Sequence, residues 1–146
     1  MQIAKGENVW NYECRQGTTL YLCLEDSFER IQSRLYDITD DAPDNIHFAI
    51  LANSINDGLT EQIENFLILH PDTNFIMIKE LTVLRAANKH KIAILCAHHL
   101  RKMNDDDPLN MLSGTTGLTG VMDTIFVLHK DKRFENSATL YCTGRG

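Results

Sequence analysis

Residues 19–38 read TLYLCLEDSFERIQSRLYDI, an apolar run that passes directly into a helical pattern. The first part, Thr19–Leu24, is almost continuously apolar, which favours a strand covered on both faces, as in a parallel sheet. The second part, residues 26–38, repeats its apolar residues at helical spacing along one stripe. A strand followed at once by a helix predicts an α/β layer architecture.

The rest of the chain repeats this alternation. Helical patterns cover residues 60–70, where Thr60 is the expected N-cap, and residues 81–90. We therefore expect an α/β fold with a mostly parallel sheet, flanked by helices and joined by right-handed crossovers. The further predicted strands are Ile46–Leu51, Asn74–Ile78, Ile92–Ala97, Thr124–His129 and Ala138–Thr143.

Length and composition limit the class of protein. The 146 residues, with no internal repeat and no linker, predict a single domain over residues 1–146. The net charge of -6 weighs against a protein that coats nucleic acid. No apolar run approaches the roughly 20 residues that span a bilayer, and the first residues lack a leader pattern. We expect a soluble, cytoplasmic protein without a membrane partner.

Four cysteines lie far apart, with no CxxC pair. Because three of them stand inside apolar runs, buried reduced thiols are the favoured interpretation over a disulfide or metal framework. The adjacent His98 and His99, taken with the acidic run 105–107, lack the spacing of a metal site. That acidic run is interpreted as a solvated turn.

Polar residues follow several of the predicted strands. Ligands of open α/β sheets bind beyond the carboxyl ends of the strands, and the residues found there suit a phosphate-rich ligand. Glu25 would orient or deprotonate water, and Arg145 would stabilise transferring charge. The alternative for this segment is structural, since Asp26 or Ser27 would cap the helix that follows.

Five strings along the chain occur in the order found in one ATPase family. They are LYLCLEDS (20–27), IAILCAHHLRK (92–102), SGTTGLTG (113–120), DTIFVL (123–128) and LYCTGR (140–145). In these strings the chain resembles RecA-like ATPases of the RepA type, which are hexameric, helicase-like AAA ATPases of mobile genetic elements. The resemblance runs from about Tyr12 to the end. It implies a RecA-like sheet, ATP and Mg²⁺ as cofactors, and ancestral work in DNA replication or mobilisation.

The resemblance also assigns roles to individual residues. The catalytic glutamate of the family corresponds to Glu25, and its polar sensor corresponds to His98 and His99. Of these two, we assign His99 to catalysis and His98 to the nucleotide. The basic residue that reaches a neighbouring subunit's nucleotide corresponds to Arg145.

A loop that faces DNA or a neighbouring subunit in RecA relatives corresponds to residues 101–120. Arg101 and Lys102 at its start are the candidate nucleic-acid-binding residues. In the intact family, contact with DNA would run through this loop.

The chain departs from the family in the residues that bind the nucleotide phosphates and Mg²⁺. A P-loop needs Gly-Lys followed by Ser or Thr to cradle phosphates and hold Mg²⁺, and the chain contains no Gly-Lys dipeptide. We expect the P-loop strand to be missing and the sheet to be incomplete. After the Walker B-like strand Asn74–Ile78, Lys79 stands where the family has aspartate. Glu80 would be the substitute, although a shift of one residue turns a side chain to the other face of a strand.

Three functions stay open at this point. The first is a truncated RecA-like ATPase domain that cannot hydrolyse ATP by itself. The second is a non-catalytic interaction module that forms homo-oligomers through exposed strand edges. The third is a subunit that completes an ATP site together with a partner carrying the P-loop.

Overall fold

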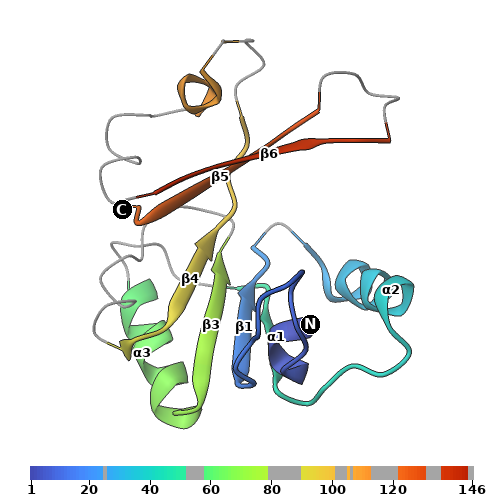
Figure 1. Cartoon of the computed structure of the whole chain (residues 1–146). Helices are drawn as coiled ribbons and strands as arrows, with labels where there is room; N and C mark the ends of the chain where they lie inside the picture. Colours follow the sequence, from blue (N-terminus) through green and yellow to red (C-terminus); the bar gives the residue numbers. More distant parts are fainter. Residues whose placement is uncertain are drawn as a thin grey trace. The chain divides into compact units, whose positions relative to one another are not determined.

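The structure is a computed structural model that describes residues 1–24, 26–51, 58–78, 90–100, 105, 107–112, 122–130 and 136–144 (Figure 1). The chain divides into two compact units, Met1–Ala97 and His98–Gly146. The expectation of one domain over residues 1–146 stays a prediction, and each unit is described by itself below.

The first unit is built on a parallel sheet of four strands in the order β2-β1-β3-β4. Every neighbouring pair is parallel, which confirms the α/β class and the mostly parallel sheet expected from the sequence. The strands are β1 (Thr18–Leu22), β2 (Ile46–Ala49), β3 (Thr73–Ile78) and β4 (Ala93–Cys96).

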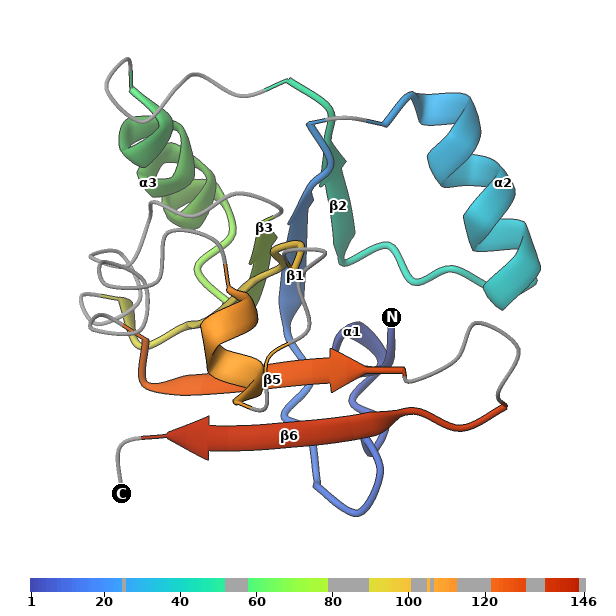
Figure 2. The same ribbon diagram turned by 90° about the horizontal axis from the view of Figure 1, so that it is seen from above.

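Helices α2 (Phe28–Ile38) and α3 (Leu59–Leu69) make the connections between these strands. Helix α2 joins β1 to β2, and α3 leads from β2 back across β1 to β3. The two connections run in opposite directions along the sheet, so right-handed crossovers require the helices to cover opposite faces. In Figure 2, α3 lies on one side of the four strands and α2 on the other.

The main hydrophobic core lies between α3 and the central strands. Leu20 and Leu22 of β1 point to the same face because they are two positions apart, and Ile76 and Ile78 are their register partners on β3. On α3, positions four apart fall on one face and pack against them. The buried cluster comprises Leu20, Leu22, Leu59, Ile63, Leu67, Ile76, Ile78 and Ile92.

Two local features of the first unit differ from the sequence expectations. Helix α3 begins at Leu59 after Gly58, whose φ of 105° lies in the left-handed region, and no side chain caps it. The expected cap Thr60 is therefore wrong, because that residue already lies in the first turn. A short helix α1 (Gln2–Lys5) was not expected; it buries Ala4, and the Asn45 side chain donates a hydrogen bond to the Ala4 carbonyl at 2.8 Å.

The second unit contains an antiparallel pair, β5 (Thr124–His129) with β6 (Thr139–Gly144), and a 3-10 helix η2 (Pro108–Met111). The positions of both strands were expected to within one residue. Their inclusion in a parallel sheet is wrong, since residues 130–138 are fewer than the dozen or more that a parallel crossover needs.

The antiparallel pairing also separates the ends of these two strands. His129, at the end of β5, is paired with Thr139 at the start of β6, and Gly144 is paired with Thr124. The last residue of β5 and the last residue of β6 therefore lie at opposite ends of the hairpin. Among the described helices, none is long and apolar enough to cross a membrane.

The buried core gives a first prediction. Ile76 is 0% exposed at the centre of the core, so Ile76→Ala is expected to lower the free energy of unfolding by about 2–5 kcal/mol through lost burial and a cavity. Urea denaturation measures this. Ile68→Ala is the matched control, because Ile68 on α3 is 74% exposed, and its effect should stay within about 0.5 kcal/mol. Similar losses for the two variants would contradict this core.

Candidate functional site

The carboxyl ends of three strands lie side by side in the first unit. Leu22 at the end of β1 is paired with Ile78 at the end of β3, which is in turn paired with Cys96 at the end of β4. In the sequence, Glu25 follows β1 and Glu80 follows β3. The structure thus brings together the strands that precede these two predicted site residues, at the edge where open α/β sheets bind ligands.

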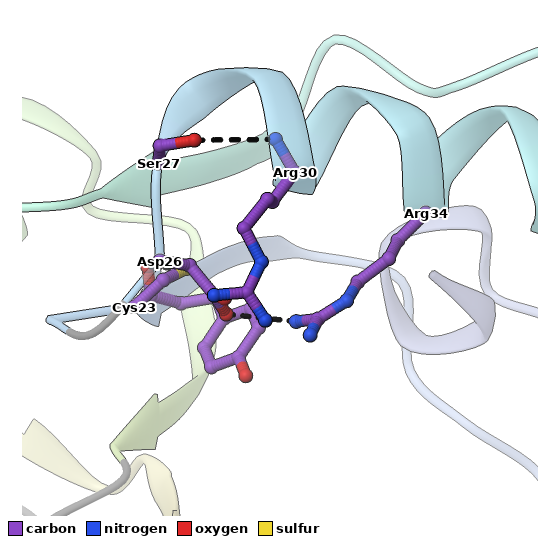
Figure 3. Close-up of polar contacts among 6 residues, drawn as sticks. Cys23, Asp26, Ser27, Arg30 and Arg34 are labelled. Atoms are coloured by element: carbon purple, nitrogen blue, oxygen red, sulfur yellow. Dashed lines mark hydrogen bonds and ion pairs between the residues drawn. The ribbon is translucent and has the colours of Figure 1, made fainter.

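The turn from β1 into α2 is held by backbone and side-chain hydrogen bonds. The Cys23 N–H donates to the Ala49 carbonyl of β2 at 2.8 Å, and the Asp26 N–H donates to the Cys23 carbonyl at 3.0 Å. The Ser27 hydroxyl then accepts a hydrogen bond from the Arg30 N–H at 3.4 Å and caps α2, as expected (Figure 3). Ser27 also holds the pKa of Glu29 below its ordinary value through a side-chain hydrogen bond.

Among the charged residues that the structure describes at this turn, Asp26 is the most enclosed. Its carboxylate accepts a hydrogen bond from Arg34 Nη1 at 2.8 Å and lies 3.5 Å from Arg30 Nη1. The Asp26 side chain is only 13% exposed, against 61% for Arg30 and 55% for Arg34. Figure 3 shows both arginine side chains reaching from α2 toward Asp26. One carboxylate of this turn therefore faces two guanidinium groups.

The two arginines were not identified as site residues from the sequence. Arg30 and Arg34 lie largely off the apolar stripe of α2. The available signal was their spacing, four and eight residues after Asp26, because positions four apart share a helix face.

Cys23, next to this turn, is a structural thiol. It is 1% exposed and its Sγ lies 3.4 Å from the Tyr21 carbonyl oxygen. Burial, with a contribution from Asp26, raises the pKa of Cys23 to about 11, so the thiol stays protonated at neutral pH and is a poor nucleophile.

All four cysteines are free, as expected. Only Cys23 is fully buried, and Cys142 is exposed. The expectation of a buried thiol in the last apolar run is therefore wrong, because in the hairpin each strand is covered on one face at most.

The predicted site residues divide into two groups. His98 and His99 are exposed residues at the start of the second unit. The predicted residues that lie outside the described part of the chain are Glu25, Glu80, Arg101, Lys102 and Arg145. The catalytic, nucleotide-binding and DNA-binding roles proposed for both groups stay predictions.

A cluster of three rings joins β2 to the end of α3. The ring centroids of His47 and His70 are 4.4 Å apart, and Phe66 lies 5.3 Å from His47 and 4.4 Å from His70. Burial, followed by repulsion from His70, lowers the pKa of His47, and nearby Asp72 acts in the opposite direction. Thr18 donates a 2.7 Å hydrogen bond to Asp72 and so lowers the pKa of that carboxyl. No sequence pattern had paired these histidines.

A groove of about 330 Å³ runs between α3 and strands β1 and β2. Its walls are apolar except for Gln62 and Asn65 of α3. The other lining residues are Leu20, Leu22, Ala49, Leu51, Leu59, Ile63, Phe66 and Leu69. This lining suits an apolar group and lacks the cationic side chains that a triphosphate needs.

The acidic run of the second unit forms a turn, as expected for Asp105 and Asp107. The Asp105 carboxylate accepts from the Asp107 N–H at 2.9 Å and from the Asn110 amide at 3.1 Å, which lowers the pKa of Asp105. Asp107 caps η2 by accepting from the Leu109 N–H at 2.9 Å. Within the described residues, no three His, Cys, Asp or Glu side chains form a group that could hold a metal ion.

Comparison of the chain with protein-family models, with curated proteins and with solved structures gave no match. The fold and the strand-end geometry define an α/β protein with a parallel sheet.

The ring cluster generates a pH prediction. The folded state disfavours protonation of His47, whereas the unfolded chain takes up that proton near pH 6.5. The free energy of unfolding is therefore expected to fall as the pH drops below about 6.5, and to fall less steeply in His47→Gln. Urea denaturation between pH 5 and 8 measures both slopes. His99→Gln, at an exposed position, should keep the wild-type slope, and identical slopes for all three proteins would contradict the assignment.

The two arginines give a matched pair of variants. Arg34→Gln is expected to lower the free energy of unfolding by about 0.5 kcal/mol, because the pair is partly exposed and screened by solvent. Arg30→Gln should cost less, since its contact with Asp26 is longer. Urea denaturation in low salt and in about 1 M salt, where screening weakens ion pairs, compares them. A larger effect at Arg30, or no response to salt, would show that Asp26 does not bind Arg34 preferentially.

Proposed function

We propose that this chain is a RecA-like ATPase domain of the RepA type that lacks its own P-loop and does not hydrolyse ATP by itself. The observation that carries the proposal is the parallel pairing of β1 with β3, which ends with Leu22 beside Ile78. A water-activating glutamate and a metal-supporting acid must meet at one phosphate group, so they need to follow adjacent strands. Glu25 and Glu80 follow such strands in the sequence.

The proposal assigns three roles in ATP hydrolysis to residues of this chain. Glu25 orients the attacking water, Arg145 stabilises the charge of the transferring phosphoryl group, and His98 and His99 sense its oxygens. Bound Mg²⁺–ATP would supply the phosphoryl group. Binding of the triphosphate by a P-loop is the role that no residue fills, since the chain contains no Gly-Lys dipeptide.

The proposed biological setting is ATP-driven work on DNA for replication or transfer of a mobile element, in the cytoplasm. Arg101 and Lys102 would contact the DNA backbone at the start of the 101–120 loop. Such contacts supply affinity that falls steeply with salt.

ATP hydrolysis tests this function directly. The wild-type chain is expected to release phosphate from Mg²⁺–ATP no faster than Glu25→Gln, because no residue grips the β- and γ-phosphates. Steady-state phosphate release measures the rate, and a titration with a fluorescent ATP analogue measures binding. Turnover by the wild-type chain clearly above that of Glu25→Gln would contradict the proposal.

Reconstitution with a P-loop segment tests whether Glu25 and Arg145 have the proposed catalytic roles. Co-expression with a RepA-type segment that carries the P-loop strand and helix is expected to restore turnover. That turnover should be lost in Glu25→Gln and in Arg145→Ala, with complex formation retained. If the restored rate of ATP hydrolysis is unchanged by both substitutions, Glu25 and Arg145 have other roles.

A non-catalytic interaction module is the second candidate function. The observation that favours it is the exposure of the β5–β6 hairpin, on which Phe126, Leu128, Leu140 and Tyr141 are 41–66% exposed. Retained self-association without any reconstituted turnover would favour this module over the ATPase.

A further inference from the structure

The hairpin of the second unit has one open apolar face. Cross-strand partners share a face in an antiparallel pair, so Phe126 with Cys142 and Leu128 with Leu140 lie on the same side. Phe126 is 53%, Leu128 66% and Leu140 41% exposed, and Cys142 is exposed as well. The opposite side carries Val127, which is only 2% exposed, and its register partner Tyr141, which is 44% exposed.

The hairpin also has an open edge. Among the described residues, β6 is paired only with β5, and all six residues of β6 are exposed. About half of their backbone N–H and C=O groups point away from β5. A two-stranded hairpin is marginally stable by itself and gains stability from a further strand. Proteins usually protect such an edge with charge or proline, and β6 (TLYCTG) has neither.

We propose that this edge binds a second copy of the same chain, with β6 pairing antiparallel to β6 around a two-fold axis. An antiparallel edge is its own complement under such an axis. The chain carries a net charge of -6, so identical copies repel over much of their surface. Residues 124–129 and 139–144 contain no Asp, Glu, Lys or Arg and bring no such charges together.

The side chains of β6 favour the register in which the two-fold axis passes through Tyr141. A continuous apolar face requires residues of the same face to stand opposite one another, which excludes a shift by one residue. With the axis at Tyr141, that residue meets its own copy, Leu140 meets Cys142, and Thr139 meets Thr143. Aromatic pairs, apolar pairs and threonine pairs are the cross-strand contacts that stabilise sheets. The dimer would then present a four-stranded sheet.

The exposed area predicts a weak dimer. Leu140 and Tyr141, the exposed large apolar residues of β6, together expose on the order of 200 Å² per copy, against about 800 Å² per partner in a stable complex. Association is therefore expected at micromolar concentrations. It needs no nucleotide, so its failure would leave the proposed ATPase ancestry unaffected.

Sedimentation velocity between about 1 and 100 μM tests the dimer. The wild-type chain is expected to shift from monomer to dimer, and Tyr141→Lys to raise the dissociation constant about tenfold or more, because two ammonium groups would face each other at the axis. The matched control is Tyr36→Lys on α2, since Tyr36 is 69% exposed in the first unit. Monomer at every concentration, or equal effects of the two lysines, would overturn the proposal.

Disulfide trapping tests the register with a variant that brings in no charge. In a Cys142→Ser background, Tyr141→Cys places two thiols directly opposite each other at the axis, within the Cα separation that a disulfide bridges. Mild oxidation is expected to give a covalent dimer for Tyr141→Cys and markedly less for Thr143→Cys, whose partner would be Thr139. Equal trapping of the two variants, or none for Tyr141→Cys, would overturn this register.

Discussion

The first unit depends on the burial of α3 against one face of a parallel sheet. Leu20 and Leu22 of β1 and Ile76 and Ile78 of β3 form the sheet side of this contact, and Ile63 forms part of the helix side. Each fully buried aliphatic side chain contributes roughly 1.5–3 kcal/mol. Any slip of β1 against β3 by one residue would turn these side chains to the opposite face. The core therefore fixes the register, and the register fixes which strand ends are neighbours.

The strand ends give the proposed function its geometry. Because β1 and β3 are held side by side, the two strands that precede Glu25 and Glu80 in the sequence end next to each other, which spacing along the chain does not show. The adjoining turn is stabilised by Asp26, whose enclosed carboxylate is paired with Arg34 and Arg30. These contacts anchor the start of α2 at the carboxyl ends of the strands, the edge at which open α/β sheets generally bind ligands.

In the second unit, unlike the first, much of the apolar surface of the strands is exposed. In its hairpin Val127 is buried, whereas Phe126 and Leu128, which point to the other face of β5, are exposed. Two strands are too few to enclose a core of their own. The two strands carry no Asp, Glu, Lys or Arg, so two copies can approach there without charge repulsion. The acidic remainder of the chain would repel an identical copy. The proposed self-pairing at β6 would supply the third strand and the edge partner that the hairpin lacks among the described residues.

The sequence by itself determined the α/β class and the positions of all six strands, and it limited the cap of α2 to Asp26 or Ser27, because these features follow from local periodicity and local hydrogen bonding. It also pointed to the residues after β1 and β3 as candidate site residues. Tertiary structure alone decided the strand order, the antiparallel pairing of β5 with β6, the exposure of Cys142, the contact of His47 with His70 and the convergence of Arg30 and Arg34 on Asp26. Each of these features depends on which segments meet across the fold, and hydrophobic periodicity shows that a face is buried without showing which partner buries it.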